Sequence, residues 1–142
     1  MTASAGEQLP DDLLDAAAAR QPIHTIMGTG FATVEQHDSV RDVARELSAN
    51  DIGAVLVSSP VGPVGIVSER DVVTVAALGV DLDAEQVKTL MSVDLVTASA
   101  TDPIAVVGRQ MVRAGVRHVA VRDGHKVIGV VSMRDVLDAL LA

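Results

Sequence analysis

The sequence predicts a mixed α/β fold of the α+β type, built from two βαββα repeats that pack with pseudo-twofold symmetry through their sheets. The first observation is an internal repeat: residues 22–73 match residues 86–137 without a gap, in a constant register of 64 positions. The second is the pattern within each copy, where short apolar strands alternate with helical periodicity. The third is size, because one copy is too small to bury a sufficient core by itself.

The two copies agree most closely where the last strand runs into the last helix. Residues 65–72 (GIVSERDV) fall on residues 129–136 (GVVSMRDV), and residues 25–27 (TIM) fall on residues 89–91 (TLM). The repeat therefore divides the chain into an N-terminal extension (1–21), repeat one (22–79), a linker (80–85) and repeat two (86–142).

Each copy predicts the same order of elements. In repeat one we expect a short helix ending near Met27, strands at 31–34, 52–57 and 64–67, and helices at 40–47 and 69–78. Asp38 and Asp102 are the expected caps of the first full helix in each copy. A capping box of Asp83 and Gln86 is expected before repeat two, and residues 12–20 fit either a short helix or a loosely ordered arm.

Composition excludes several classes of function. The net charge of -8 disfavours nucleic acid, and the single aromatic residue, Phe31, leaves little to stack on bases. No apolar run is long enough for a membrane span, and no secretory signal is visible, so we expect a cytoplasmic protein. The absence of cysteine excludes disulfides and thiolate metal sites. The spacing of the histidines fits no metal site. The sequence offers no set of a nucleophile with its base, so we do not expect an enzyme.

The strongest local motif is Gly-x-x-Ser-x-x-Asp, which occurs at Gly65, Ser68 and Asp71 and again 64 residues later. One interpretation is a capping box, in which the serine and the aspartate satisfy the first N–H groups of a helix. The other is a ligand site, because a helix N-terminus attracts phosphate and a carboxylate can accept hydrogen bonds from ribose. The repetition of Ser, Arg and Asp together favours the ligand site.

A second candidate is the pair Arg117 and His118, which follows Val116 within an apolar strand. Such a pair is costly unless it is partnered or faces a cleft, although an edge position with both tips in water is an equal alternative. The matching residues of repeat one are Gly53 and Ala54, so we expect two ligand sites of unequal charge.

Residues 51–57 (DIGAVLV) with 64–73 (VGIVSERDVV), and residues 116–121 (VRHVAV) with 127–136 (VIGVVSMRDV), resemble the cystathionine-β-synthase (CBS) domain. The resemblance extends over residues 20–142 and implies a tandem CBS pair, or Bateman module, which commonly binds AMP, ADP, ATP or S-adenosylmethionine in clefts between the repeats. The family often has proline where Leu56 and Ala120 stand. No cofactor is implied apart from an adenine nucleotide as a regulatory ligand.

Carried over to this sequence, the resemblance implies two sets of ligand-binding residues. The first cleft would be formed by Ser132, Arg134, Asp135, Arg117 and His118, with the adenine walled by Phe31, Ala32, Ile52 and Gly53. The second would be formed by Ser68, Arg70 and Asp71 with Leu95, Val96, Val116 and Arg117.

The sequence therefore favours a stand-alone regulatory module that senses an adenosine compound and acts on a protein partner in trans. The alternative is a protein-interaction module whose clefts stay empty. We also expect a homodimer, because apolar residues of the last helix of each repeat are left over after the copies pack: Val72, Val73, Val75, Ala76, Val136, Leu137, Leu140 and Leu141.

Overall fold

A computed structural model describes residues 16–28 and 31–142. The described residues form two compact units, one consisting of residues 31–95 and the other of residues 96–142 together with residues 16–28. The mixed fold with two three-stranded sheets is confirmed. The packing of one repeat on the other stays a prediction.

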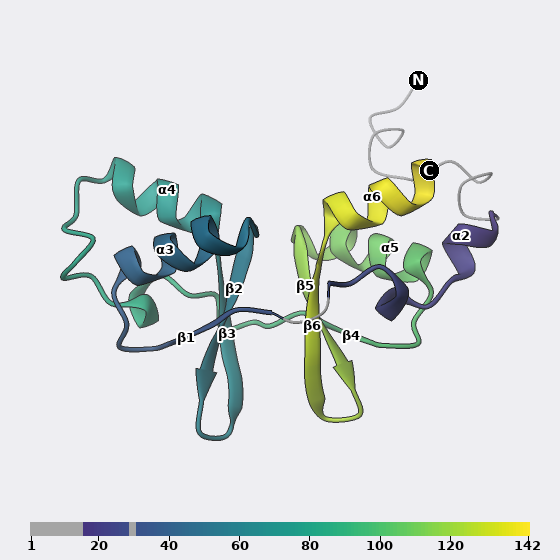
Figure 1. The fold of residues 1–142 in the computed structure, drawn as a ribbon, viewed down its shortest axis with the longest axis horizontal. Coiled ribbons are helices and arrows are strands. Elements are labelled where there is room, and N and C mark those ends of the chain that lie inside the picture. The colour runs from purple at the N-terminus through teal and green to yellow at the C-terminus, as the bar shows by residue number, and fades with distance from the viewer. Residues whose placement is uncertain (1–15, 29–30) are drawn as a thin grey trace. The chain divides into compact units, whose positions relative to one another are not determined.

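The unit of residues 31–95 is a three-stranded sheet with two helices on it. Its sheet has the order β1-β2-β3, in which β1 is parallel to β2 and β3 is antiparallel to it. Helices α3 and α4 pack on the same side of the sheet (Figure 1). In chain order the elements are β1 (Thr33–Glu35), α3 (Val40–Asn50), β2 (Ala54–Ser59), β3 (Gly62–Ser68), α4 (Glu69–Ala77) and the 3-10 turn η3 (Val87–Thr89).

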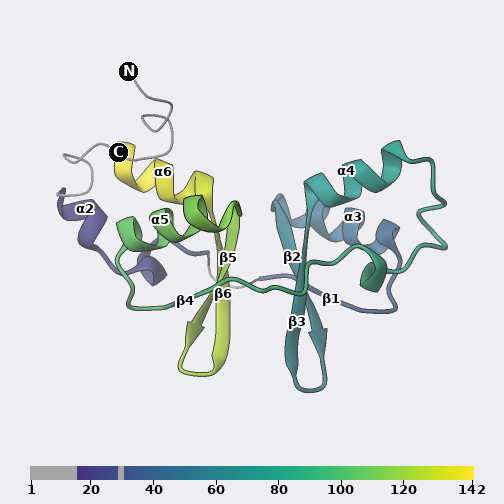
Figure 2. The same cartoon turned by 180° about the vertical axis from the view of Figure 1, so that it is seen from behind.

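The other unit repeats this arrangement, with sheet order β4-β5-β6 and helices α5 and α6 beside the long strands (Figure 2). Its elements are α2 (Ala17–Arg20), the 3-10 turn η2 (Ile23–Thr25), β4 (Thr97–Ser99), α5 (Ile104–Ala114), β5 (His118–Asp123), β6 (Lys126–Ser132) and α6 (Met133–Leu141). Helix α2 accounts for the end of the helix expected at 12–20, while residues 12–15 lie outside the described residues.

The apolar periodicity of the sequence accounts for the core of each unit. In α3 the helically spaced Val40, Val43 and Leu47 are buried. The central strand is buried at four consecutive positions, residues 54–57. Within this unit Val55 and Val57, which point to the same face of β2, belong to the core shared with α3.

The compact units and the sequence repeats divide the chain at different places. The segment that opens repeat one packs on the strands of repeat two: Ile23 N–H donates to the Asp102 carbonyl at 2.7 Å, and Ile104 N–H donates to the Gln21 carbonyl at 2.9 Å. The segment that opens repeat two does the same in the other unit, where Val87 N–H donates to the Asp38 carbonyl at 2.9 Å. Each unit is thus completed by the segment that opens the other repeat, which we call the leading segment of that repeat.

Two glycines lie close to the docked segments. A β-carbon on Gly65 would stand 2.8 Å from the Ser92 carbonyl oxygen, which is closer than real β-carbons approach such an atom, and 3.0 Å from the Met91 sulfur. On Gly129 it would stand 2.7 Å from the Met27 sulfur. The glycine of each repeated motif therefore leaves room for the methionine of a leading segment.

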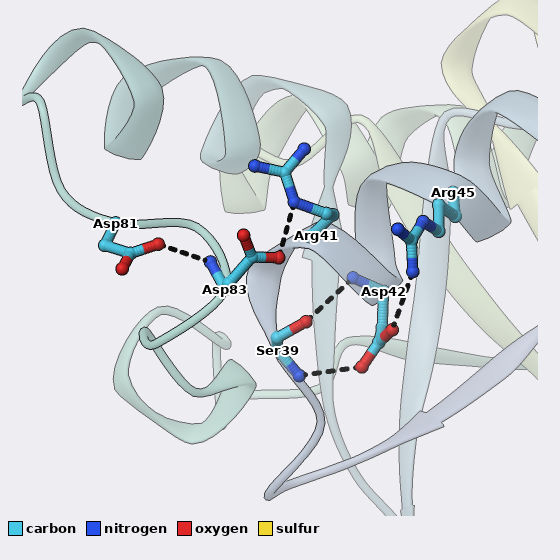
Figure 3. Close-up of polar contacts among 6 residues, drawn as sticks. All are labelled: Ser39, Arg41, Asp42, Arg45, Asp81 and Asp83. Carbon is cyan, nitrogen blue, oxygen red and sulfur yellow. Dashed lines mark hydrogen bonds and ion pairs between the residues drawn. The ribbon is translucent and has the colours of Figure 1, made fainter.

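The caps expected for the first full helix of each repeat are wrong by one residue. Ser39 is the N-cap of α3: its hydroxyl accepts from Asp42 N–H at 3.1 Å, and the Asp42 carboxylate accepts from Ser39 N–H at 3.0 Å (Figure 3). Asp38 instead closes the preceding turn by accepting from Glu35 N–H at 2.8 Å, because a carboxylate can satisfy a turn as well as a helix. Asp102 does the same for Ser99 N–H, and Pro103 is the N-cap of α5.

The hydrogen bonds from Ser39 also hold the pKa of Asp42 below its usual value of 3.8, with a smaller contribution from the Arg45 guanidinium. A carboxyl whose pKa falls on folding stabilises the fold above its unfolded pKa, and that contribution disappears as the pH falls through the folded value. Asp42 therefore contributes to acid sensitivity below about pH 4.

The expected capping box of Asp83 and Gln86 is also wrong. Asp83 pairs with Arg41 of α3 (Figure 3). Gln86 precedes η3 with no side-chain cap. The leading segments are single 3-10 turns, so their ends are satisfied by neighbouring backbone in place of a cap. In η3, for example, Lys88 N–H donates to the Gln36 carbonyl at 3.0 Å.

Candidate functional site

Within residues 31–95, three element starts meet at one end of the sheet. Ala54, which opens β2, lies opposite Ser68, which closes β3. The first N–H of α4, from Glu69, donates to the Gly53 carbonyl at 2.9 Å, and the Ala32 carbonyl beside β1 accepts from Leu56 N–H at 3.1 Å. The antiparallel pairing of β2 with β3 thus places the serine of the motif next to the start of the central strand.

The same end of the other sheet gathers the equivalent residues. His118, which opens β5, lies opposite Ser132, which closes β6. The first N–H of α6, from Met133, donates to the Arg117 carbonyl at 2.7 Å, and the Val96 carbonyl accepts from Ala120 N–H at 3.1 Å. Arg117 and His118 are therefore neighbours of the serine and aspartate motif in one unit.

Both motifs form a capping box. Ser132 N–H donates to the Asp135 carboxylate at 2.8 Å, and Asp135 N–H donates to the Ser132 hydroxyl at 3.1 Å. Ser68 and Asp71 have the same pair of bonds. Each aspartate uses one oxygen, Oδ2, in the cap, and within the described part of the chain its other oxygen has no hydrogen bond, so it can still accept from a ligand hydroxyl.

The cap leaves one backbone N–H group without a described partner at each helix start. The N–H groups of Ser132, Met133 and Asp135 are all satisfied, whereas that of Arg134 has no partner among residues 16–28 and 31–142. The same holds for Arg70 N–H in α4. Both arginine side chains are exposed, and neither pairs with a carboxylate in the described residues. Each helix therefore offers an N–H group and a guanidinium to an anion.

Arg117 and His118 lie in different environments, although they are neighbours in the chain. Arg117 precedes β5, is exposed, and makes no ion pair with another described residue. His118 is the first residue of β5, is half-buried, and has a polar partner. The arginine tip thus reaches solvent beside the helix start, as in the edge alternative, and remains available to a ligand.

The remaining predicted residues are divided between the units. Phe31, 38% exposed, lies with Ala32, Ile52, Gly53 and Leu95 in the unit that carries Ser68, Arg70 and Asp71. Val96 and Val116 lie with Arg117, His118, Ser132, Arg134 and Asp135 in the other. How a ligand divides these residues between two clefts stays a prediction.

The sequence interpretation passed over the residue between the serine and the arginine of each motif. In α4 this residue is Glu69, and in α6 it is Met133; both follow the N-cap directly. The register of 64 positions between the repeats already reveals this replacement of Glu69 by Met133, because it is the one change of charge between the two copies of the motif. No group of three His, Asp or Glu side chains in the described residues could hold a metal ion. Nor is any helix there both long and apolar enough to cross a membrane.

Comparison with known proteins identifies one family. The sequence pattern of the CBS domain matches residues 23–77 and again residues 87–142. An uncharacterized protein of Methanopyrus kandleri is 30% identical over 99 residues, which is 68% of this chain. The chain spans about half the length of that relative, which is matched over 50%.

Solved structures of CBS-domain proteins have the same fold. One is a CBS domain protein from Pyrobaculum aerophilum complexed with AMP, with 27% identity and a TM-score of 0.74, covering 85% of this chain and 99% of that one. Another is the hexameric CBS-CP12 protein of bloom-forming cyanobacteria, with 25% identity and a TM-score of 0.77, covering 82% of this chain and 66% of that one.

Proposed function

The chain belongs to the CBS-domain family, with two copies of the domain, and from this premise we propose that it is a regulatory module that binds an adenosine compound and catalyses no reaction itself. The candidate ligands are AMP, ADP, ATP and S-adenosylmethionine. A protein partner regulated in trans, and action in the cytoplasm, are parts of the same proposal.

The observation that carries the proposal is the grouping around Ser132. Arg117, the Arg134 side chain and the Arg134 N–H offer positive charge and a donor at the start of α6, where the helix dipole also favours an anion. The open oxygen of Asp135 can accept from a sugar hydroxyl. A phosphate and a ribose together match these groups, and the AMP complex of the Pyrobaculum aerophilum protein supports this choice of ligand.

We expect AMP at 100 times its dissociation constant to raise the free energy of unfolding by about 2.7 kcal/mol, because it binds only the folded chain. Thermal unfolding in the presence of AMP, ADP, ATP and S-adenosylmethionine measures this increase, and guanosine monophosphate is the control for the base. No shift with any adenosine compound would contradict ligand sensing.

A protein-interaction module with empty sites is the second candidate, and helix α4 favours it. From Val72 to Leu78 the only polar residue is Thr74, yet no residue of α4 is buried. Val73 is 65% exposed and Leu78 75% exposed. A helix that is apolar on nearly every side is ordinarily covered, so α4 is a surface for association.

The apolar face expected on α6 is smaller than the sequence indicated. Val136 and Leu140 are buried in the core of their own unit, where they contribute to folding, and this part of the expectation is wrong. Leu137 and Leu141 remain exposed.

We propose that a second copy of the chain covers α4, and we expect a homodimer of about twice the chain mass of 14.7 kDa. Light scattering at micromolar concentration measures the mass. Val73→Glu should shift the population toward monomer, because it places a charge in the apolar contact. Val61→Glu is the matched control, because Val61 is 93% exposed in the turn between β2 and β3 and lies outside α4. A wild-type mass near that of one chain would contradict the homodimer.

A further inference from the structure

The two helix starts differ in charge, although their backbones match bond for bond. Around α6 stand two arginines, Arg117 and Arg134, against one carboxylate, Asp135. Around α4 the position of Arg117 is taken by Gly53, and Arg70 stands against two carboxylates, Glu69 and Asp71. When only these side chains are counted, each within its own unit, the start of α6 has an excess of positive charge. The start of α4 has an excess of negative charge.

The hydroxyl groups of the two motifs differ in the same direction. The Ser68 hydroxyl donates to the Asp71 carboxylate at 3.0 Å, so its proton is already used. In the described residues the Ser132 hydroxyl accepts from Asp135 N–H and donates to no carboxylate. The Ser132 hydroxyl can therefore donate a hydrogen bond to an anion at α6. The Ser68 hydroxyl at α4 already donates to Asp71.

Glu69 is the residue that most distinguishes the two ends. It occupies the first position of α4, its N–H is bonded to the Gly53 carbonyl, and its side chain is exposed. Its carboxylate offsets the positive end of the helix dipole, with which a bound phosphate would otherwise interact. Met133 holds the same position in α6 without charge, and its N–H is bonded in the same way.

We infer that the two sites select ligands of different charge: the site at Ser132 takes phosphorylated adenosine compounds, and the site at Ser68 takes an adenosine compound without phosphate. Glu69 is the specificity-determining residue that excludes phosphate from the second site. The inference rests on the proposed function, since it assigns ligand classes to the sites proposed there.

Calorimetric titration of the full chain with AMP and with adenosine tests this. Wild type should bind one AMP per chain tightly. Glu69→Gln removes the charge and keeps the shape, and it should tighten AMP binding at the second site by about tenfold, the size of one like-charge repulsion near a protein surface. Adenosine binding should stay unchanged, and the gain for AMP should shrink in 0.5 M salt.

Met133→Glu is the matched reverse variant, and it should weaken AMP binding at the first site by about tenfold. Thermal unfolding without ligand verifies that both variants are folded. Two equally tight AMP sites in wild type, or an AMP titration unchanged by Glu69→Gln, would overturn the inference and leave the proposed function standing. If wild type binds neither AMP nor adenosine, the proposed function fails and the inference fails with it.

Discussion

Replacing Ile23 by alanine is expected to lower the free energy of unfolding by about 2–5 kcal/mol. The Ile23 side chain is fully buried in a core that it shares with Ile104 and Val136, which belong to the second repeat. Truncation leaves a cavity that the surrounding strands and helices fill only in part, and the lost contacts add to the cost. Urea unfolding followed by circular dichroism measures the change.

His24→Ala is the matched control, because His24 is exposed and uses its backbone N–H, not its ring, to bind the Ala100 carbonyl. It should change stability by less than about 0.5 kcal/mol. Hydrogen exchange locates the effect: Ile23→Ala should speed exchange in residues 96–142 first. Faster exchange confined to residues 31–95 would contradict the packing of the leading segment on the second sheet.

Asp135→Ala is expected to weaken AMP binding by about 1.5–3 kcal/mol, which is a tenfold loss or more. Its open carboxylate oxygen is the acceptor proposed for a ribose hydroxyl, and the two arginines beside it can pair with a phosphate. Asp71→Ala removes the same cap from α4 and should affect AMP less, because the arginine equivalent to Arg117 is replaced by Gly53. Calorimetry on both variants makes the comparison.

Asp135→Asn separates ligand binding from capping. An amide oxygen can still accept from Ser132 N–H, so the helix start is retained, while the charge and one acceptor are removed. AMP binding should fall with little loss of stability. Arg117→Ala should in turn reduce the preference for AMP over adenosine. Equal losses of AMP affinity from Asp135→Ala and Asp71→Ala would contradict the inequality of the two sites.

Much of the local structure could be predicted because it depends on neighbours in the chain. The pairing of Ser132 with Asp135 follows from a spacing of three residues at the start of a helix, which any helix offers. The buried run at residues 54–57 follows from four apolar side chains in succession. The same logic failed at Asp38, because a turn and a helix start compete for a carboxylate and the spacing fits both.

By itself the sequence determined the repeat, the order of strands and helices in each copy, and the two motifs, since all of these are patterns over short distances. Only the tertiary structure decided which sheet each leading segment completes. Ile23 and Val87 are both apolar and hold equivalent places, so their composition suits either core. The choice is made by backbone bonds such as that from Ile23 N–H to the Asp102 carbonyl. A backbone bond between segments so far apart in the chain has no signature in local sequence, because every residue there except proline offers the same donor and acceptor.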